Sequence, residues 1–196
     1  PVSFAMGVAE LGREIRTSSG MEHDRIAAYR VVAEHAGKGV VLDAHAAWTV
    51  ASLDLLDVVE AVLGPIHIPR SAMDDLLTFR GFRESQFLPE LSLVHRDGQY
   101  FKTERDEAAV EARDLYVAQQ IEKIEKACVV SPVVAPNTLG KLEDLVLEFC
   151  GERVLDPVFL CAGGRLLLCE DLKYRAYAHQ IVNRRGILTP YRRPIL

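Results

Sequence analysis

Short apolar runs alternate along this chain with longer stretches that carry a helical pattern of apolar residues. Four of these runs fit buried strands, and they lie at residues 39–43, 66–68, 127–131 and 165–169. Strands buried on both faces of a parallel sheet are apolar throughout, and parallel strands need long crossover connections. The alternation therefore predicts an α/β protein, in which helices cover one mainly parallel sheet as a three-layer α/β/α sandwich.

Helical patterns fill the intervals between the predicted strands. We expect Asp54 to cap the second half of one long helix, Pro69 to open the next helix, and Asn137 or Thr138 to cap the helix that ends near Gly151. The expected helices span residues 22–36, 44–63, 69–79, 104–126, 137–151, 156–162 and 172–183, and a last short strand spans residues 186–189.

One segment, at about residues 91–104, departs from this alternation. It contains Asp97-Gly98 between two β-rich stretches, and this dipeptide favours the two-residue turn of a β-hairpin. We expect an exposed hairpin insertion outside the main sheet, which mediates self-association or guards the functional cleft. The remaining pattern predicts a helical lead-in at residues 1–37, one domain at residues 38–190 and a tail at residues 191–196.

Four aspartates lie at or near the ends of the predicted strands. Asp43 ends the first run, Asp75 follows the second, and Asp171 ends the last, while Asp156 begins a short helix before that last strand. The carboxyl ends of parallel strands meet at the edge where open α/β sheets bind ligands. Carboxylates in one cleft repel each other, and a hard divalent cation with oxygen ligands removes that conflict. The sequence therefore predicts a metal site at this edge of the sheet.

Each aspartate also has a structural interpretation. Asp171 and Asp156 both precede helical patterns and could serve as helix N-caps. Asp75 could be a solvated helix residue, and Asp74 beside it is a rival for the same role. This kind of interpretation is weakest for Asp43, because an ionised acid at the end of an apolar run needs a partner.

Charge and cysteine spacing limit the classes of protein. The net charge of −5 argues against a protein that simply coats nucleic acid. After Asp171 no acid follows, and the basic residues there, including Lys173, Arg184 and Arg185, either face phosphates or form a solvated tail. The four cysteines form no CxxC pair, so we expect reduced, mostly buried thiols in a cytoplasmic protein.

The chain has no segment typical of membrane insertion or secretion. No run approaches the roughly 18 apolar residues of a membrane span, so we expect no membrane contact. The chain begins at Pro1 without Met and without a basic leader. We therefore expect a processed product or an excised domain.

The order of these features resembles a PIN domain. The resemblance rests on the strand that ends in Asp43, the strand–Pro–helix unit that carries Asp75, Asp156 in the sequence Leu-Asp-Pro-Val, and Asp171 in Leu-Cys-Glu-Asp-Leu. It covers about residues 38–190. The hairpin and the ending around Asp171 are most similar to bacterial PIN domains attached to helical-repeat or regulatory segments.

PIN domains are metal-dependent nucleases with an α/β/α sandwich. The resemblance implies that Asp43, Asp75, Asp156 and Asp171 hold Mg²⁺ or Mn²⁺ and hydrolyse phosphodiester bonds, most often in single-stranded RNA. It further implies a regulatory partner or attached domain, and we allow for a homo-oligomer. Substrate contacts are expected from His45, Lys173, Arg184 and Arg185.

Three positions depart from the pattern of the family. Asp75 stands where the family usually has Glu, His45 where it usually has a small hydroxyl or amide residue, and Cys169 where it usually has Thr or Ser. A second hypothesis is therefore a degenerate PIN module that binds RNA or a protein partner without cutting. A third is a phosphohydrolase that acts on small nucleotides with the same metal chemistry.

Overall fold

Four short strands form one parallel sheet at the centre of the protein. The computed structural model describes residues 22–85, 91–104, 107–134, 140–151 and 153–184. Within these ranges the sheet has the order β5-β2-β1-β6 and its neighbouring strands are all parallel. The strands are β1 (Val40–Leu42), β2 (Ile66–Pro69), β5 (Val129–Ser131) and β6 (Leu166–Leu168). The predicted parallel sheet is therefore confirmed.

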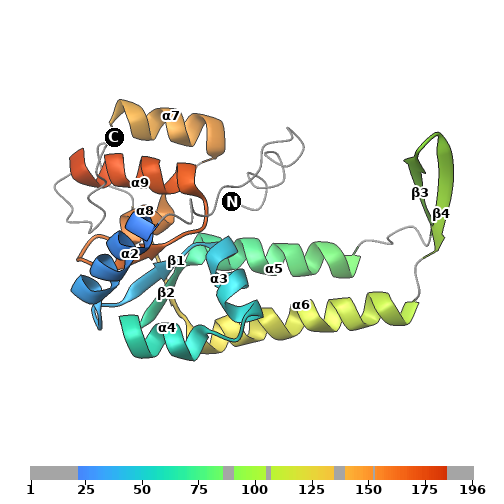
Figure 1. Cartoon of the computed structure of the whole chain (residues 1–196), viewed down its shortest axis with the longest axis horizontal. Coiled ribbons are helices and arrows are strands. Elements are labelled where there is room, and N and C mark those ends of the chain that lie inside the picture. The colour runs from blue at the N-terminus through green and yellow to red at the C-terminus, as the bar shows by residue number, and fades with distance from the viewer. Residues whose placement is uncertain (1–21, 86–90, 105–106, 135–139, 152, 185–196) are drawn as a thin grey trace.

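Helices cover both faces of this sheet, which confirms the α/β/α sandwich (Figure 1). One face belongs to the larger core cluster, which the helices at residues 44–127 help to form. The other face packs against a smaller cluster from the helices at residues 141–184. The helices are α2 (Glu22–His35), α3 (Ala44–Ser52), α4 (Leu56–Leu63), α5 (Arg70–Ser85), α6 (Glu107–Ala127), α7 (Lys141–Cys150), α8 (Asp156–Leu160) and α9 (Leu172–Arg184).

The period of two along the strands divides the apolar side chains between these clusters. In β6, Leu166 and Leu168 belong to the larger cluster, whereas Leu167 packs against the smaller one. Val40 and Leu42 of β1 lie beside Leu166 and Leu168 and join the larger cluster. Successive side chains of a strand point to opposite faces. The continuous apolar runs therefore follow from a sheet buried on both faces.

The prediction of one helix over residues 44–63 is wrong in one respect, because the structure has two helices there. Asp54 lies between α3 and α4 with a φ of 54°, a left-handed conformation that Asp tolerates better than most residues. Asp54 does not cap α4, whose N-cap is Leu55. Instead its carboxylate accepts a hydrogen bond from Lys123 Nζ at 2.5 Å. A break at this point lets the chain turn back toward β2.

Two further helix starts differ from the prediction. Pro69 is the last residue of β2, and α5 begins at Arg70. The helix α7 begins after Gly140, which is its N-cap, and the expected caps Asn137 and Thr138 lie outside the described residues. The expected strand at residues 186–189 and the tail at residues 191–196 also lie outside them.

The cysteines agree with the expectation of reduced, mostly buried thiols. All four cysteines have free thiols, and three of them are buried. Among the helices that the structure describes, none is long and apolar enough to cross a membrane.

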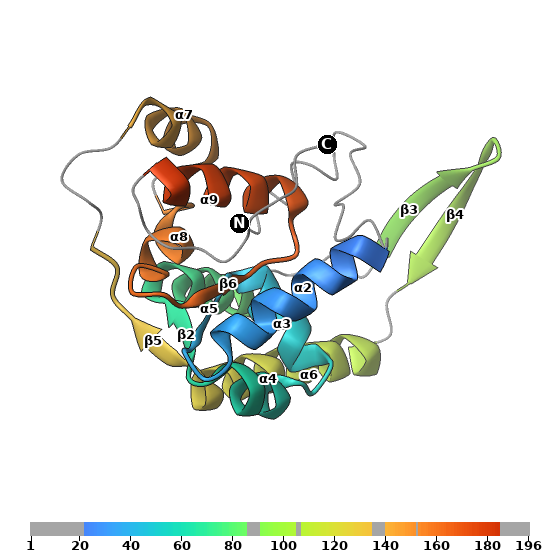
Figure 2. The same cartoon turned by 60° about the vertical axis from the view of Figure 1, so that its left-hand side comes forward.

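The segment at residues 91–104 is a hairpin that forms a sheet of its own. Its strands are β3 (Leu91–Arg96) and β4 (Gln99–Glu104). Asp97 and Gly98 have φ values of 52° and 76°, as a type I′ turn requires at both central positions. The described side chains of the hairpin are exposed, and Figures 1 and 2 show it beyond the ends of α5 and α6. The predicted exposed insertion is confirmed.

We expect the hairpin to be dispensable for folding. Replacing residues 91–104 with a short Gly-Ser linker should change the free energy of unfolding by less than about 1 kcal/mol, because the entropy of loop closure varies slowly with length. Urea unfolding followed by circular dichroism measures this. Loss of cooperative unfolding in the shortened protein would show that the hairpin is part of the core.

Candidate metal centre

Asp43 is a buried acid at the carboxyl end of β1. Its side chain caps α3, because one carboxylate oxygen, Oδ1, accepts a hydrogen bond of 2.7 Å from the backbone N–H of Ala46. The first N–H groups of a helix have no partner within the helix, so this bond fixes the direction of the carboxylate. Asp43 is only 6% exposed. The end of the strand and the start of the helix therefore hold an acid where water has little access.

Burial raises the pKa of Asp43 above its ordinary value. The Ala46 amide, the Cys169 thiol and the His45 ring lower this pKa, and the nearby Glu170 raises it. The net result is a carboxylate whose charge is poorly stabilised by its surroundings. A divalent cation beside Asp43 would supply the missing stabilisation.

Asp171 lies three residues beyond the end of β6, directly before α9. Its Oδ1 accepts a hydrogen bond of 3.2 Å from the backbone N–H of Tyr174, so Asp171 also caps a helix, α9. The interpretation of Asp171 as an N-cap is therefore confirmed. This does not exclude a ligand role, because a carboxylate has two oxygens and several lone pairs.

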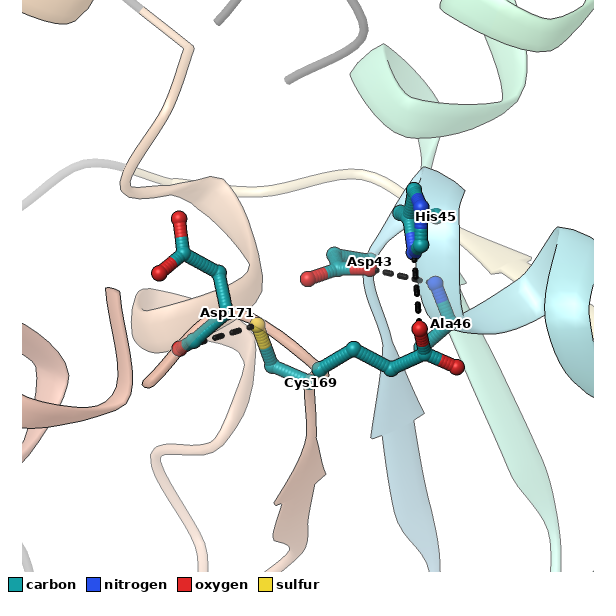
Figure 3. A network of polar contacts seen from close by, with 6 residues as sticks. Asp43, His45, Ala46, Cys169 and Asp171 are labelled. Atoms are coloured by element: carbon teal, nitrogen blue, oxygen red, sulfur yellow. Dashed lines mark hydrogen bonds and ion pairs between the residues drawn. The ribbon is translucent and has the colours of Figure 1, made fainter. Parts of the chain in front are cut away.

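Cys169 lies between these two acids. Its thiol donates a hydrogen bond of 3.9 Å to the carbonyl oxygen of Asp171, and its interaction with the carboxylate of Asp43 lowers the pKa of that acid. Figure 3 shows the sulfur with Asp43 on one side and Asp171 on the other. Burial, followed by the charge of Asp43, raises the pKa of the thiol, so Cys169 stays protonated and acts as a donor. Because β1 and β6 are neighbours, the two capping acids lie at one edge of the sheet.

Asp156 is held by a residue that the sequence analysis did not single out. Its Oδ2 accepts a hydrogen bond of 2.5 Å from the hydroxyl of Ser71, which is buried in the first turn of α5. Burial raises the pKa of Asp156, whereas Ser71 and Arg153 lower it. Asp156 is the first residue of α8 and makes no cap, so its interpretation as an N-cap is wrong. Ser71 ties it instead to the carboxyl end of β2.

The hydroxyl of Tyr174 interacts electrostatically with two of the acids. Its hydroxyl donates a hydrogen bond of 2.5 Å to the carbonyl oxygen of Val154. Burial raises the pKa of Tyr174, and the charges of Asp43 and Asp156 raise it further. These two acids, which belong to distant parts of the chain, therefore both lie near the same buried hydroxyl.

The other residues predicted for the site lie around this edge or outside the described structure. Asp75 is half-buried on α5, one turn after Ser71, and its neighbour Asp74 lies 3.6 Å from Arg153 as an exposed ion pair. His45 is in the first turn of α3 and contacts Glu170. Lys173 and Arg184 belong to α9, but the structure does not describe their side chains. Arg185 lies outside the described residues.

Two residues of this edge, Ser71 and Glu170, were missed by the sequence analysis. Both could have been found by the rule that identified the aspartates, because each follows the end of a strand. Ser71 comes soon after β2, and Glu170 comes soon after β6. What the rule does not supply is the partner of each side chain.

The donors suit a hard divalent cation, although their present arrangement does not surround one. Carboxylates are the protein ligands that Mg²⁺ and Mn²⁺ prefer, and the buried charge of Asp43 lacks a cation. In the part of the chain that the structure describes, no three His, Cys, Asp or Glu side chains are close enough together to hold an ion. Binding of an ion would therefore require these carboxylates to come closer together.

Acids at the carboxyl edge of a parallel sheet in an α/β/α sandwich are the arrangement of a PIN domain. Residues 41–180 match the model of the PIN domain associated with the TPR-GreAB-C-PIN system. The match covers more than half of the chain, and the chain belongs to this family. Searches among curated proteins and among solved structures found no match.

We expect Ser71→Ala to destabilise the fold by about 1–2 kcal/mol, because it leaves the partly buried carboxylate of Asp156 without its donor. Urea unfolding at neutral pH measures the loss. The control is the same substitution in an Asp156→Asn background, where the cost should be clearly smaller because the acceptor has no charge. Equal costs in both backgrounds would show that the hydrogen bond to Asp156 is not the cause.

Asp43→Asn should stabilise the fold at neutral pH. The raised pKa means that the native state binds more protons than the unfolded state, so stability falls as pH rises from the ordinary Asp value through the folded pKa. An amide at residue 43 removes this loss, and each unit of pKa corresponds to about 1.4 kcal/mol. Urea unfolding against pH should show the advantage of the variant above this window and none below it. An advantage independent of pH would contradict the explanation.

Proposed function

We propose that this PIN domain is a cytoplasmic ribonuclease that depends on Mg²⁺ or Mn²⁺ and hydrolyses phosphodiester bonds in single-stranded RNA. Membership of the PIN family suggests a nuclease-like function. The observation that carries the proposal is the pair of capping acids, Asp43 and Asp171, on neighbouring strands around the thiol of Cys169. A structural role would explain each cap alone, but it does not explain why one of the caps is a buried acid with a raised pKa.

Under this proposal Asp43, Asp156 and Asp171 would hold the ion, and Asp75 would contribute directly or through a water molecule. A bound divalent cation would polarise the phosphate and lower the pKa of an attacking water. Ser71 keeps Asp156 oriented, and the Ala46 amide keeps Asp43 oriented. These hydrogen bonds already restrict the rotation of each carboxylate, so less rotational freedom is lost when an ion binds.

The same edge of the sheet suits an RNA backbone. Both α3 and α9 begin there, and the N-terminal ends of helices carry partial positive charge that favours phosphate. Lys173 lies in the first turn of α9, at this edge, whereas Arg184 is at the other end of α9 and Arg185 follows it in the sequence. We propose that these residues neutralise phosphates and that His45 contacts the substrate beside Asp43.

The second candidate function is a PIN module that binds RNA or a protein partner without cutting. It is favoured by the lack of three clustered ligands among the described residues. The departures at Asp75, His45 and Cys169 also favour it, because they alter the ligand set that the resemblance implies. The hairpin, with Tyr100 at 76% exposure, would then offer a contact surface for an attached domain or a second copy.

We expect the protein to bind Mn²⁺ and cleave single-stranded RNA slowly, with both properties lost most strongly in Asp43→Asn. That change keeps the size of the side chain but removes a charge, and we expect Mn²⁺ binding to weaken by about tenfold or more. Isothermal titration and cleavage of a labelled single strand measure the two effects. Asp57→Asn, which alters an exposed acid on α4, is the control and should change neither.

The outcomes separate the candidates. No Mn²⁺ binding at millimolar concentration would overturn the metal site and favour the module that does not cut. Mn²⁺ binding without cleavage would retain the site but contradict the nuclease. Cleavage of small nucleotides in preference to RNA would identify a phosphohydrolase instead.

A further inference from the structure

A side-chain contact connects the two helices that Asp43 and Asp171 cap. Nδ1 of His45 lies 3.2 Å from Oε2 of Glu170. His45 is in the first turn of α3, and Glu170 immediately precedes the cap of α9. Figure 3 shows this contact as the dashed line below the ring of His45, beside Asp43.

The contact closes a ring of covalent and non-covalent links around the two acids. On one side β1 leads through Asp43 to His45, and on the other β6 leads through Glu170 to Asp171. The two strands are hydrogen-bonded neighbours, with Leu42 beside Leu168 at the end of the pairing. The backbone therefore fixes one end of this ring and the His45–Glu170 contact fixes the other.

Partial burial gives this contact more weight than an ordinary surface ion pair. The side chain of His45 is 43% exposed and that of Glu170 is 29% exposed. Fully exposed pairs contribute little because water and salt screen them. Here the two side chains are partly shielded from water, so screening weakens their contact less than it weakens a fully exposed pair.

We propose that the His45–Glu170 contact is a positioning device that holds the starts of α3 and α9 together, and so keeps Asp43 and Asp171 near enough to each other to share a divalent cation. This inference rests on the proposed function. Two carboxylates repel each other before an ion arrives, and without a link between their helices they relax apart. Helix starts that are already held together reduce the cost of binding, because less of the site must be ordered when the ion enters.

Glu170 could instead strengthen metal binding by its charge alone. An acid near a cation attracts it whatever its neighbours do, so that effect would not need His45. A positioning contact needs both partners. The two explanations therefore differ in whether the effect of Glu170 depends on His45, and a double-mutant cycle measures this dependence.

The experiment measures Mn²⁺ dissociation constants by isothermal titration for the wild type, His45→Ala, Glu170→Ala and the double variant. We expect each single substitution to weaken binding by about tenfold, as is typical for residues that support metal ligands. The double variant should bind Mn²⁺ about as well as the single variant that has lost more affinity. Losses that multiply to about a hundredfold in the double variant would overturn the positioning role.

A conservative variant distinguishes position from charge. Glu170→Gln removes the charge but keeps the size of the side chain and an oxygen that can accept a hydrogen bond from Nδ1, so it should retain affinity within about threefold. A loss equal to that of Glu170→Ala would show that charge is what matters. Glu122→Ala removes an exposed acid that pairs with Lys126 on α6, and as a control it should leave binding unchanged.

The remaining outcomes distinguish this inference from the proposed function. Failure of the wild type to bind Mn²⁺ would overturn both. Wild-type binding with unaltered affinity in His45→Ala and Glu170→Ala would overturn the positioning role alone. Urea unfolding of each variant shows whether a weakened site reflects loss of the fold. Weak binding at normal stability supports the positioning role only together with the non-additive double variant.

Discussion

The burial of a carboxylate at the end of β1 is the constraint on which the rest of this site depends. A charge removed from water is costly unless hydrogen bonds or a cation compensate it. Asp43 obtains partial compensation from the Ala46 amide and the Cys169 thiol, and its pKa is still raised. A sequence selected only for stability would place a neutral residue at this position. The retained acid is therefore best explained by a function that uses its charge, at some cost to the fold.

Three consecutive strands of the sheet each bring one polar element to the same edge. Asp43 follows β1 and Asp171 follows β6, and both residues begin the next helix by capping it. The third strand, β2, leads to Ser71, which recruits Asp156 from the opposite layer through a hydrogen bond. Helix capping thus orients the two acids at the strand ends, whereas Asp156 depends on a contact between distant segments. The order of the strands in the sheet is therefore as important for this site as the acids themselves.

The sequence was sufficient to predict the fold, because apolar runs in a sheet buried on both faces are distinct from helical periodicity. It did not reveal the break at Asp54, since the apolar pattern of the helix continues on both sides of it. Pairing between side chains was not predictable for a different reason. The contacts of Ser71 with Asp156 and of His45 with Glu170 depend on which strands are neighbours. Periodicity gives the position of each strand in the chain but not its place in the sheet.

The helix α5 extends from the carboxyl edge of the sheet toward the hairpin. It begins beside Ser71, which holds Asp156, and its sixteen residues correspond to a length of roughly 24 Å. A continuous helix resists compression along its axis, because its backbone hydrogen bonds run parallel to that axis. A force along the axis at the far end of α5 would therefore be transmitted to the start of the helix. There it would act on the hydroxyl group of Ser71, which orients Asp156.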